Sequence, residues 1–268
     1  MTIDVDAYFA RIGYQGPRTP TLATLRALHA LHPRAIAFEC LDPWSRRSVE
    51  LAPAALEAKL VRGGRGGYCY EQNGLLAHVL RALGFEVHGR AARVRWGVPD
   101  DVVLPRSHMV LRVELEEGSY LADVGFGLIT PLAPLRLVDD VEQETPLETF
   151  RFRAEGERRA LEVRSREGWR ALYWFDDATF LAPDYETLNW WTSTSPASRF
   201  VQNLIAARPT KNGRLRLVNR ELTFQTPDGP AEVHTIASAA ELRRVLEREF
   251  GIDLSGIDAP LERLFAER

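Results

Sequence analysis

The sequence predicts an α+β protein in three successive parts: a helical bundle over residues 1–85, an antiparallel β-barrel or compact sheet over 86–194, and a mixed α/β part over 195–268. In the first part, apolar residues recur every three or four positions, the spacing of one helix face. From Phe85 the chain changes to short runs separated by glycine, proline or charged turns, which is typical of antiparallel strands. From Ser195 the two patterns mix, so helices and strands are segregated along most of the chain, as in α+β folds.

The helical part contains three candidate helices. In TLATLRALHALHP, residues 21–33, leucines follow the helical spacing and Pro33 ends the pattern. APAALEAKLV, residues 52–61, is a shorter helix. The third begins near Cys69 and is closed by Gly84. Its apolar stripe consists of Leu75, Leu76, Val79, Leu80 and Leu83.

The central and C-terminal parts follow in order. The strand-like runs are VRWGV, HMVLRVELEEG, SYLADVGFG, FRFRAEG, RALEVRSREG and WRALYWF. Ser195 and Pro196 open a predicted helix that carries Phe200, Leu204 and Ile205. GRLRLVNRELTF predicts a hairpin, and AAELRRVLEREFG predicts a final amphipathic helix that ends at a glycine.

Composition excludes several classes of function. The 268 residues suffice for a large core, and a net charge of −3 gives no general affinity for nucleic acid or anionic membranes. No apolar run is long enough to cross a bilayer, and MTIDVDAYFARIG lacks the features of a signal peptide. The two cysteines, Cys40 and Cys69, imply no disulfide framework, so we expect a reducing, cytoplasmic setting.

Cys69 is the first candidate for chemistry. In RGGRGGYCYEQN it follows two glycine pairs and opens a helix, where free N–H groups and the helix dipole favour a thiolate. Arg62 and Arg65 add positive charge nearby. A thiolate is a nucleophile in covalent catalysis, but a small buried core residue is the alternative interpretation of Cys69 alone. RGGRGG lacks the Lys-Ser/Thr ending of a phosphate-binding loop.

A thiolate nucleophile works with a base and an orienting group. His108 opens the strand SHMVLRVEL, and Asp123 lies in the next, apolar strand. A buried carboxylate needs a partner, and His108 is a candidate, although capping of the glycine-rich turn explains Asp123 equally well. Of the remaining histidines, His29 and His32 lie in a leucine-rich helix and are expected to be surface or packing residues. His78 lies roughly 13 Å along the Cys69 helix, too far to pair with Cys69. His88 and His234 have no acidic or catalytic neighbourhood in the sequence.

Simple hairpin register does not bring His108 and Asp123 together. If residues 116–119 form the turn, Leu115 pairs with Tyr120 and Asp123 faces Arg112. His108 then lies four residues further along its strand, roughly 13 Å away. The contact needs a bulge, another register or strong curvature.

Several segments resemble a known family. RGGYCYEQN, SHMVLRVE and YLADVGFG resemble the signature segments of the arylamine N-acetyltransferases. FECLDPWSRRSVEL, GFEVHGRAARVRWG and STSPASRFVQNLIAARPTKNGRLRL resemble further segments of that family in the same order. The resemblance implies a helical bundle, a β-barrel and an α/β lid around a cysteine-protease-like core, with a catalytic triad of Cys69, His108 and Asp123. One departure is Cys40, where the family commonly has asparagine.

The resemblance also implies a reaction. We expect ping-pong transfer of acetyl from acetyl-CoA, through acetyl-Cys69, to an arylamine, arylhydrazine or N-hydroxyarylamine, without a metal. Glu39 is expected to pair with Arg65 and hold the loop before Cys69. The implied binding residues are Phe38, Phe126 and Phe200 for the acceptor and Gly127 and Thr210 for CoA.

Three other functions remain open from the sequence. An amide synthase would use the same triad on a carrier-bound polyketide chain, and a hydrolase would release acid without an amine acceptor. A non-enzymatic binding protein would retain Cys69 without its reactivity. The physiological acceptor, whether a xenobiotic amine, a drug hydrazide or a metabolite, is not predicted, and neither is the oligomeric state.

Overall fold

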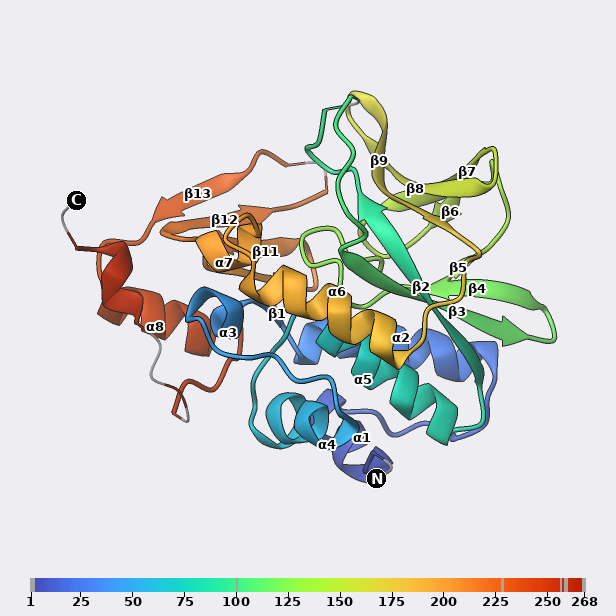
Figure 1. Ribbon diagram of the computed structural model, residues 1–268, viewed down its shortest axis with the longest axis horizontal. Coiled ribbons are helices and arrows are strands. Elements are labelled where there is room, and N and C mark those ends of the chain that lie inside the picture. Colours follow the sequence, from blue (N-terminus) through green and yellow to red (C-terminus); the bar gives the residue numbers. More distant parts are fainter. Residues whose placement is uncertain (1–2, 100, 228, 256, 258–259, 267–268) are drawn as a thin grey trace.

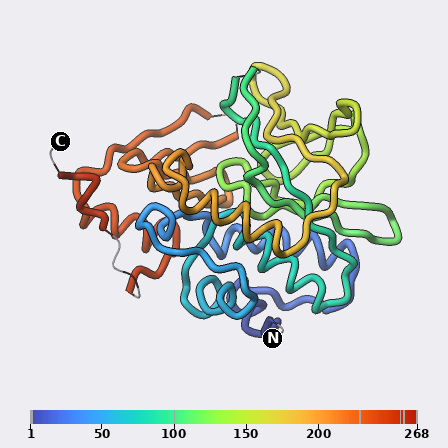
Figure 2. The backbone as a smooth tube through the Cα atoms, in the orientation of Figure 1, coloured from blue at the N-terminus to red at the C-terminus, as the bar shows by residue number. Residues whose placement is uncertain are grey.

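The computed structural model describes residues 3–99, 101–227, 229–255, 257 and 260–266. In Figure 1 the N-terminal helices, blue to teal, lie below the barrel, and the C-terminal sheet with α8 lies to the left. Figure 2 follows the backbone from the blue helices through the green and yellow barrel to the red C-terminal part. Within the described ranges, no helix combines the length and the hydropathy that a transmembrane span requires.

The N-terminal helices surround one apolar core and place Cys69 at the head of a helix. Thr21 caps α2, which continues through Pro33 to Ala35. The predicted end at Pro33 is therefore wrong, because a proline in the last turn removes only one helical hydrogen bond. α5 begins at Cys69 as predicted, and Gly84 follows its end with a φ of 87°. The helices are α1 Val5–Ile12, α2 Leu22–Ala35, α3 Leu41–Trp44, α4 Pro53–Leu56, the π-helical turn Glu57–Arg62 and α5 Cys69–Ala82.

The central part is an eight-stranded antiparallel sheet that curls into a nearly closed barrel. Its strand order is β5-β4-β3-β2-β9-β8-β7-β6. The two edge strands, β5 and β6, are joined by the Gln143 side chain, which accepts from the Arg136 N–H (2.7 Å) and donates to the Arg136 carbonyl (2.9 Å). The strands are β2 Glu86–Val94, β3 His108–Leu115, β4 Gly118–Ala122, β5 Leu135–Arg136, β6 Gln143–Glu144, β7 Thr149–Glu155, β8 Arg158–Ser165 and β9 Gly168–Asp176.

The C-terminal part is a second antiparallel sheet covered by a helix. Its order is β1-β10-β11-β12-β13, so β1 ties it to the N-terminal helices. On α8, Leu242 and Leu246 are buried against this sheet, as the amphipathic pattern predicted. The elements are β1 Phe38–Glu39, α6 Ala182–Thr194, α7 Arg199–Gln202, β10 Ile205–Pro209, β11 Arg214–Val218, β12 Glu221–Gln225, β13 Glu232–Thr235, α8 Ala239–Arg248 and the 3-10 turn Leu261–Leu264.

Two predicted elements are displaced. The strand predicted at VRWGV lies earlier, as β2, and ends at Val94. The helix predicted from Ser195 to Ile205 is present only as the short α7, which carries Phe200. Its predicted extent is wrong, because the long helix α6 ends at Thr194 and Ile205 belongs to β10. The sequence pattern misses α6 because Trp190 and Trp191 on it are exposed, so it has no clean apolar stripe.

Candidate active site

The start of α5 holds Cys69 in a fixed and nearly inaccessible position. The side chain is 3% exposed, and Sγ lies 3.5 Å from the Ser107 carbonyl oxygen. The turn after β4 approaches so closely that a Cβ on Gly125 would lie 2.8 Å from the Cys69 Cα. In the loop before α5, a Cβ on Gly66 would lie 2.1 Å from the Ala37 carbonyl oxygen. Close approach therefore explains these glycines.

Beneath that loop lies a buried charge cluster of Glu39, Asp42, Lys59, Arg65 and Glu71. Arg65 donates twice to one oxygen of Glu39, at 2.7 and 3.0 Å, which confirms the expected pairing. The Lys59 Nζ lies 2.6 Å from both Asp42 and Glu71. Burial, and further the negative charges of Glu39 and Asp42, raise the Glu71 pKa to about 7 against the opposing charge of Lys59. The second Glu71 oxygen accepts the Tyr68 N–H at 3.1 Å, so the cluster is hydrogen-bonded to the residue that immediately precedes α5.

His108 and Asp123 are in contact, with His108 Nε2 2.7 Å from Asp123 Oδ2. The predicted hairpin register is wrong by two residues: Leu115 pairs with Gly118, across a tighter turn. Continuing this register would set Asp123 opposite Val110, only two residues from His108. Since β4 ends at Ala122, the chain turns at Asp123 and its carboxylate meets the imidazole.

Asp123 is held by hydrogen bonds to both of its carboxylate oxygens. Oδ1 accepts from Asn73 Nδ2 at 2.9 Å and from the Gly125 N–H at 3.0 Å, while Oδ2 also accepts from the Tyr173 hydroxyl at 2.9 Å. Burial alone would raise the Asp123 pKa, but the charge of His108 and these hydrogen bonds lower it. The carboxylate therefore stays ionised. The glycine-turn role considered for Asp123 is present as well, through Gly125.

The protonated form of His108 is favoured in this setting. Burial alone would lower the His108 pKa, yet the charge of Asp123 and hydrogen bonds with Asp123 and Cys69 raise it to about 10. An ionised carboxylate only accepts hydrogen bonds, so the ring nitrogen on Asp123 carries a proton in every state. The other nitrogen, Nδ1, is then left for the Cys69 side chain, whose hydrogen bond is among the causes of the raised His108 pKa. The arrangement suits a thiolate–imidazolium pair.

Three residues of this hydrogen-bond network were not predicted from the sequence. Asn73 lies one helical turn after Cys69 and also accepts the Val124 N–H at 2.9 Å, so its spacing was an available signal. His29, expected as a surface or packing residue, is fully buried, and its Nε2 accepts the Asp123 N–H at 3.0 Å. Burial lowers the His29 pKa to about 4, which keeps that acceptor neutral. Tyr173 comes from β9, and nothing in its local sequence indicates the contact.

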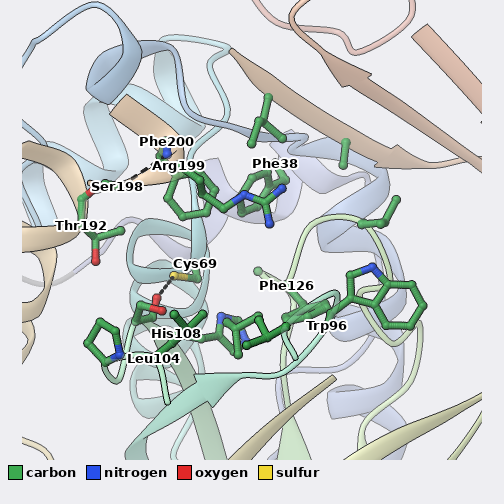
Figure 3. Close-up of a pocket in the computed structure, with 18 of the residues that line it drawn as sticks. Phe38, Cys69, Trp96, Leu104, His108, Phe126, Thr192, Ser198, Arg199 and Phe200 are labelled. Atoms are coloured by element: carbon green, nitrogen blue, oxygen red, sulfur yellow. Dashed lines mark hydrogen bonds between the residues drawn. The ribbon is translucent and has the colours of Figure 1, made fainter. Parts of the chain in front are cut away.

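A cavity of about 240 Å³ opens above Cys69 (Figure 3). Phe38 and Phe200 face each other on one side with ring centroids 5.9 Å apart. Phe126 lies beside the His108 ring, 5.2 Å between centroids. The three phenylalanines singled out in the sequence therefore line one cavity together with Cys69 and His108.

Gly127 and Thr210, the predicted CoA contacts, serve local structure. Gly127 has a φ of 85°, and a Cβ there would lie 3.1 Å from the Phe38 ring. The Thr210 hydroxyl donates to the Gly213 carbonyl (3.0 Å) and accepts its N–H (3.1 Å), so it closes a turn. Among the residues that line the cavity in the described chain, neither is present. CoA binding at these positions stays a prediction.

Comparison with known proteins decides the family. The model of a family described as N-acetyltransferase matches residues 21–259. The chain belongs to the arylamine N-acetyltransferase family. It is 41% identical to an arylamine N-acetyltransferase of Mycobacterium tuberculosis over 261 residues, which cover 96% of this chain and 92% of that protein. The resemblance seen in the sequence is thereby confirmed, as is the assignment to an acyltransferase family.

Two further relatives extend the comparison. A Salmonella typhimurium protein named arylamine N-acetyltransferase / N-hydroxyarylamine O-acetyltransferase is 36% identical, covering 96% of this chain and 92% of that protein. The structure of the Mycobacterium marinum enzyme in complex with CoA superposes with a TM-score of 0.93 at 41% identity, covering 97% of both chains. The predicted α+β fold of bundle, barrel and lid is therefore that of the family.

Within the described residues, no group of three or more histidine, cysteine, aspartate or glutamate side chains is arranged to hold a metal ion. The polar side chains at the cavity floor are instead paired with one another.

Proposed function

We propose that this protein transfers an acetyl group from acetyl-CoA to an arylamine, arylhydrazine or N-hydroxyarylamine by a ping-pong mechanism through acetyl-Cys69. The observation that carries the proposal is the Cys69–His108–Asp123 arrangement at the floor of an aromatic cavity, in a chain of this family. Relatives named for arylamine and N-hydroxyarylamine transfer, and one solved with CoA, support the two substrates.

In the first half-reaction, His108 holds the proton of Cys69, and the thiolate attacks the thioester carbonyl of acetyl-CoA. The bond from that carbon to the CoA sulfur breaks as the tetrahedral intermediate collapses, and His108 returns its proton to the CoA thiolate. Asp123 orients the ring and stabilises its charged form. N–H groups in the first turn of a helix have no intrahelical acceptor, so those of Cys69 and Tyr70 are suited to hold the oxyanion.

In the second half-reaction, the amine nitrogen attacks the acetyl carbon on Cys69. His108 takes the proton that the nitrogen loses, and the Cys69 thiolate leaves. Phe38, Phe126 and Phe200 supply apolar walls for a flat ring. We retain Gly127 and Thr210 as proposed CoA contacts. We also retain the cytoplasmic setting as a prediction.

Intact-mass measurement tests the proposal directly. The protein is mixed with acetyl-CoA in the absence of amine, and we expect one acetyl adduct that maps to Cys69 and disappears when an arylamine is added. Cys69→Ala should show no adduct, whereas Cys40→Ala is the matched control that should still be acetylated. No adduct, with Cys69 still rapidly alkylated, would contradict acetyl-CoA as donor and favour an amide synthase or hydrolase.

A further inference from the structure

The cavity contains a guanidinium group that the acetyl-transfer mechanism does not use. Arg199, the first residue of α7, lines the cavity, and Figure 3 shows its side chain extending toward Phe38. His108 and Phe126 lie on the other side of Cys69 in the same view. Arg199 therefore lies across the cavity from the imidazole.

Arg199 has no anionic partner in the described part of the chain. Its guanidinium carbon lies 6.0 Å from the centroid of the Phe200 ring. Arg214, on the neighbouring sheet, is by contrast clamped by both oxygens of Glu148, at 2.5 and 2.6 Å. An arginine directed into a site without a carboxylate is available for a ligand.

The charge of the cavity also favours an anionic ligand. Arg216 also lines it and has only a 3.4 Å contact with the exposed Glu221. Partial burial, and further the charge of Arg216, lower the Arg199 pKa. The described lining includes no aspartate or glutamate. The cavity is therefore electropositive at the end away from the triad.

We propose that Arg199 selects aromatic amines that carry a carboxylate or similar anionic group on the ring, on the side opposite the amine; this rests on the proposed acetyl transfer. The amine must reach the acetyl group on Cys69, which places the ring among Phe38, Phe126 and Phe200 and directs its opposite end away from Cys69, toward Arg199. The cavity volume of about 240 Å³ is below the roughly 300–1,000 Å³ of pockets for drug-sized ligands, which favours a one-ring acceptor. A guanidinium binds a carboxylate with two parallel hydrogen bonds, so the selectivity is geometric as well as electrostatic.

The test compares two acceptors that differ in charge. Enzyme acetylated on Cys69 is mixed with 4-aminobenzoate or with neutral 4-aminobenzamide, and the rate of loss of the acetyl group is measured in a single turnover. The ratio of the two second-order rate constants is compared between the wild type and Arg199→Met, so that the intrinsic difference in amine reactivity cancels. Arg199→Lys retains the charge but cannot make the two parallel hydrogen bonds of a guanidinium. Arg216→Met is the matched control, because Arg216 lines the same cavity.

We expect wild-type enzyme to prefer the carboxylate and Arg199→Met to lower the ratio about 10- to 100-fold, the range of a hydrogen bond to a charged group. Arg199→Lys should retain part of the preference, and Arg216→Met should change the ratio less than Arg199→Met does. An unchanged ratio in Arg199→Met overturns the proposal. So does a loss confined to acetylation by acetyl-CoA, which would assign Arg199 to the CoA phosphates.

A binding measurement separates this proposal from the proposed function. Calorimetric titration of Cys69→Ala with each acceptor needs no acetyl transfer, and the added Arg199→Met change should weaken only 4-aminobenzoate. If acetyl-Cys69 never forms, acetyl transfer fails while the binding result still decides the role of Arg199. Equal binding of the two acceptors by the parent variant overturns the selectivity whatever the reaction.

Discussion

Asn73→Ala should loosen the hold of Asp123 on His108 and destabilise the fold at the same time. The Asn73 side chain is fully buried, donates to the Met109 carbonyl (2.7 Å) and to Asp123 (2.9 Å), and accepts the Val124 N–H (2.9 Å). A hydrogen bond to a charged group contributes about 1.5–3 kcal/mol, and each buried backbone group left unsatisfied costs about 1–3 kcal/mol. The higher helix propensity of alanine returns only about 0.5 kcal/mol. With the low end of each range, we expect the free energy of unfolding to fall by at least about 3 kcal/mol.

The assay pairs urea unfolding with the alkylation rate of Cys69 per folded molecule, which does not depend on any substrate. Because Asn73 holds Asp123 and Asp123 holds His108, alkylation at neutral pH should slow about tenfold or more, on the scale of one charged hydrogen bond. Glu162→Ala is the control: it loses bonds from Arg151 and Arg153 on the barrel, away from the cavity. It should destabilise the protein without slowing alkylation. A stability loss under about 1 kcal/mol, or equal slowing in the control, would refute this account of Asn73.

Three further outcomes are expected. Because the folded-state pKa of His108 is raised to about 10, its stabilisation is present below pH 6.5 and lost as pH rises through 10. Urea unfolding at pH 6.5 and pH 10 should show a smaller loss for Asp123→Asn than for the wild type, and an equal loss contradicts the assignment. The folded-state pKa of Glu71 is also raised, to about 7, so the stability of Glu71→Gln relative to the wild type should improve from pH 5 to pH 8; no trend in paired urea titrations would exclude this. Gly125→Ala, whose Cβ would lie 2.8 Å from the Cys69 backbone, should abolish acetylation in the intact-mass assay, whereas Gly13→Ala, at a φ of 71° with open space around it, should cost only about 1 kcal/mol and retain it.

The sequence predicts the identity of the triad better than its assembly. The glycine pairs and the apolar stripe of α5 place Cys69 at a helix start, and the structure agrees. The contact between His108 and Asp123 depends on a two-residue shift in hairpin register and on the bend after Ala122. Turn length sets register, and a run such as ELEEGSYL allows more than one turn.

The residues around the triad were less predictable, for two physical reasons. Asn73 and His29 lie on helices where an isolated polar residue is ordinarily exposed, and only tertiary packing buries them. Tyr173 reaches Asp123 because β9 pairs with β2, which brings together segments 50 residues apart. The α6 helix was not predicted, because it carries large exposed aromatic residues instead of an apolar stripe on one face.

The Asn73 side chain joins two structural layers, since it belongs to α5 and its partners, Met109 and Asp123, belong to the barrel part. Cys69, the proposed nucleophile, therefore comes from one layer, and its proposed base His108 and orienting carboxylate Asp123 come from the other. A folding chain whose helices and strands had each formed would still lack a reactive thiolate pair until α5 docked on β3. Reactivity at Cys69 is thus a chemical reporter of this docking step. During refolding it should appear later than the secondary structure seen by circular dichroism.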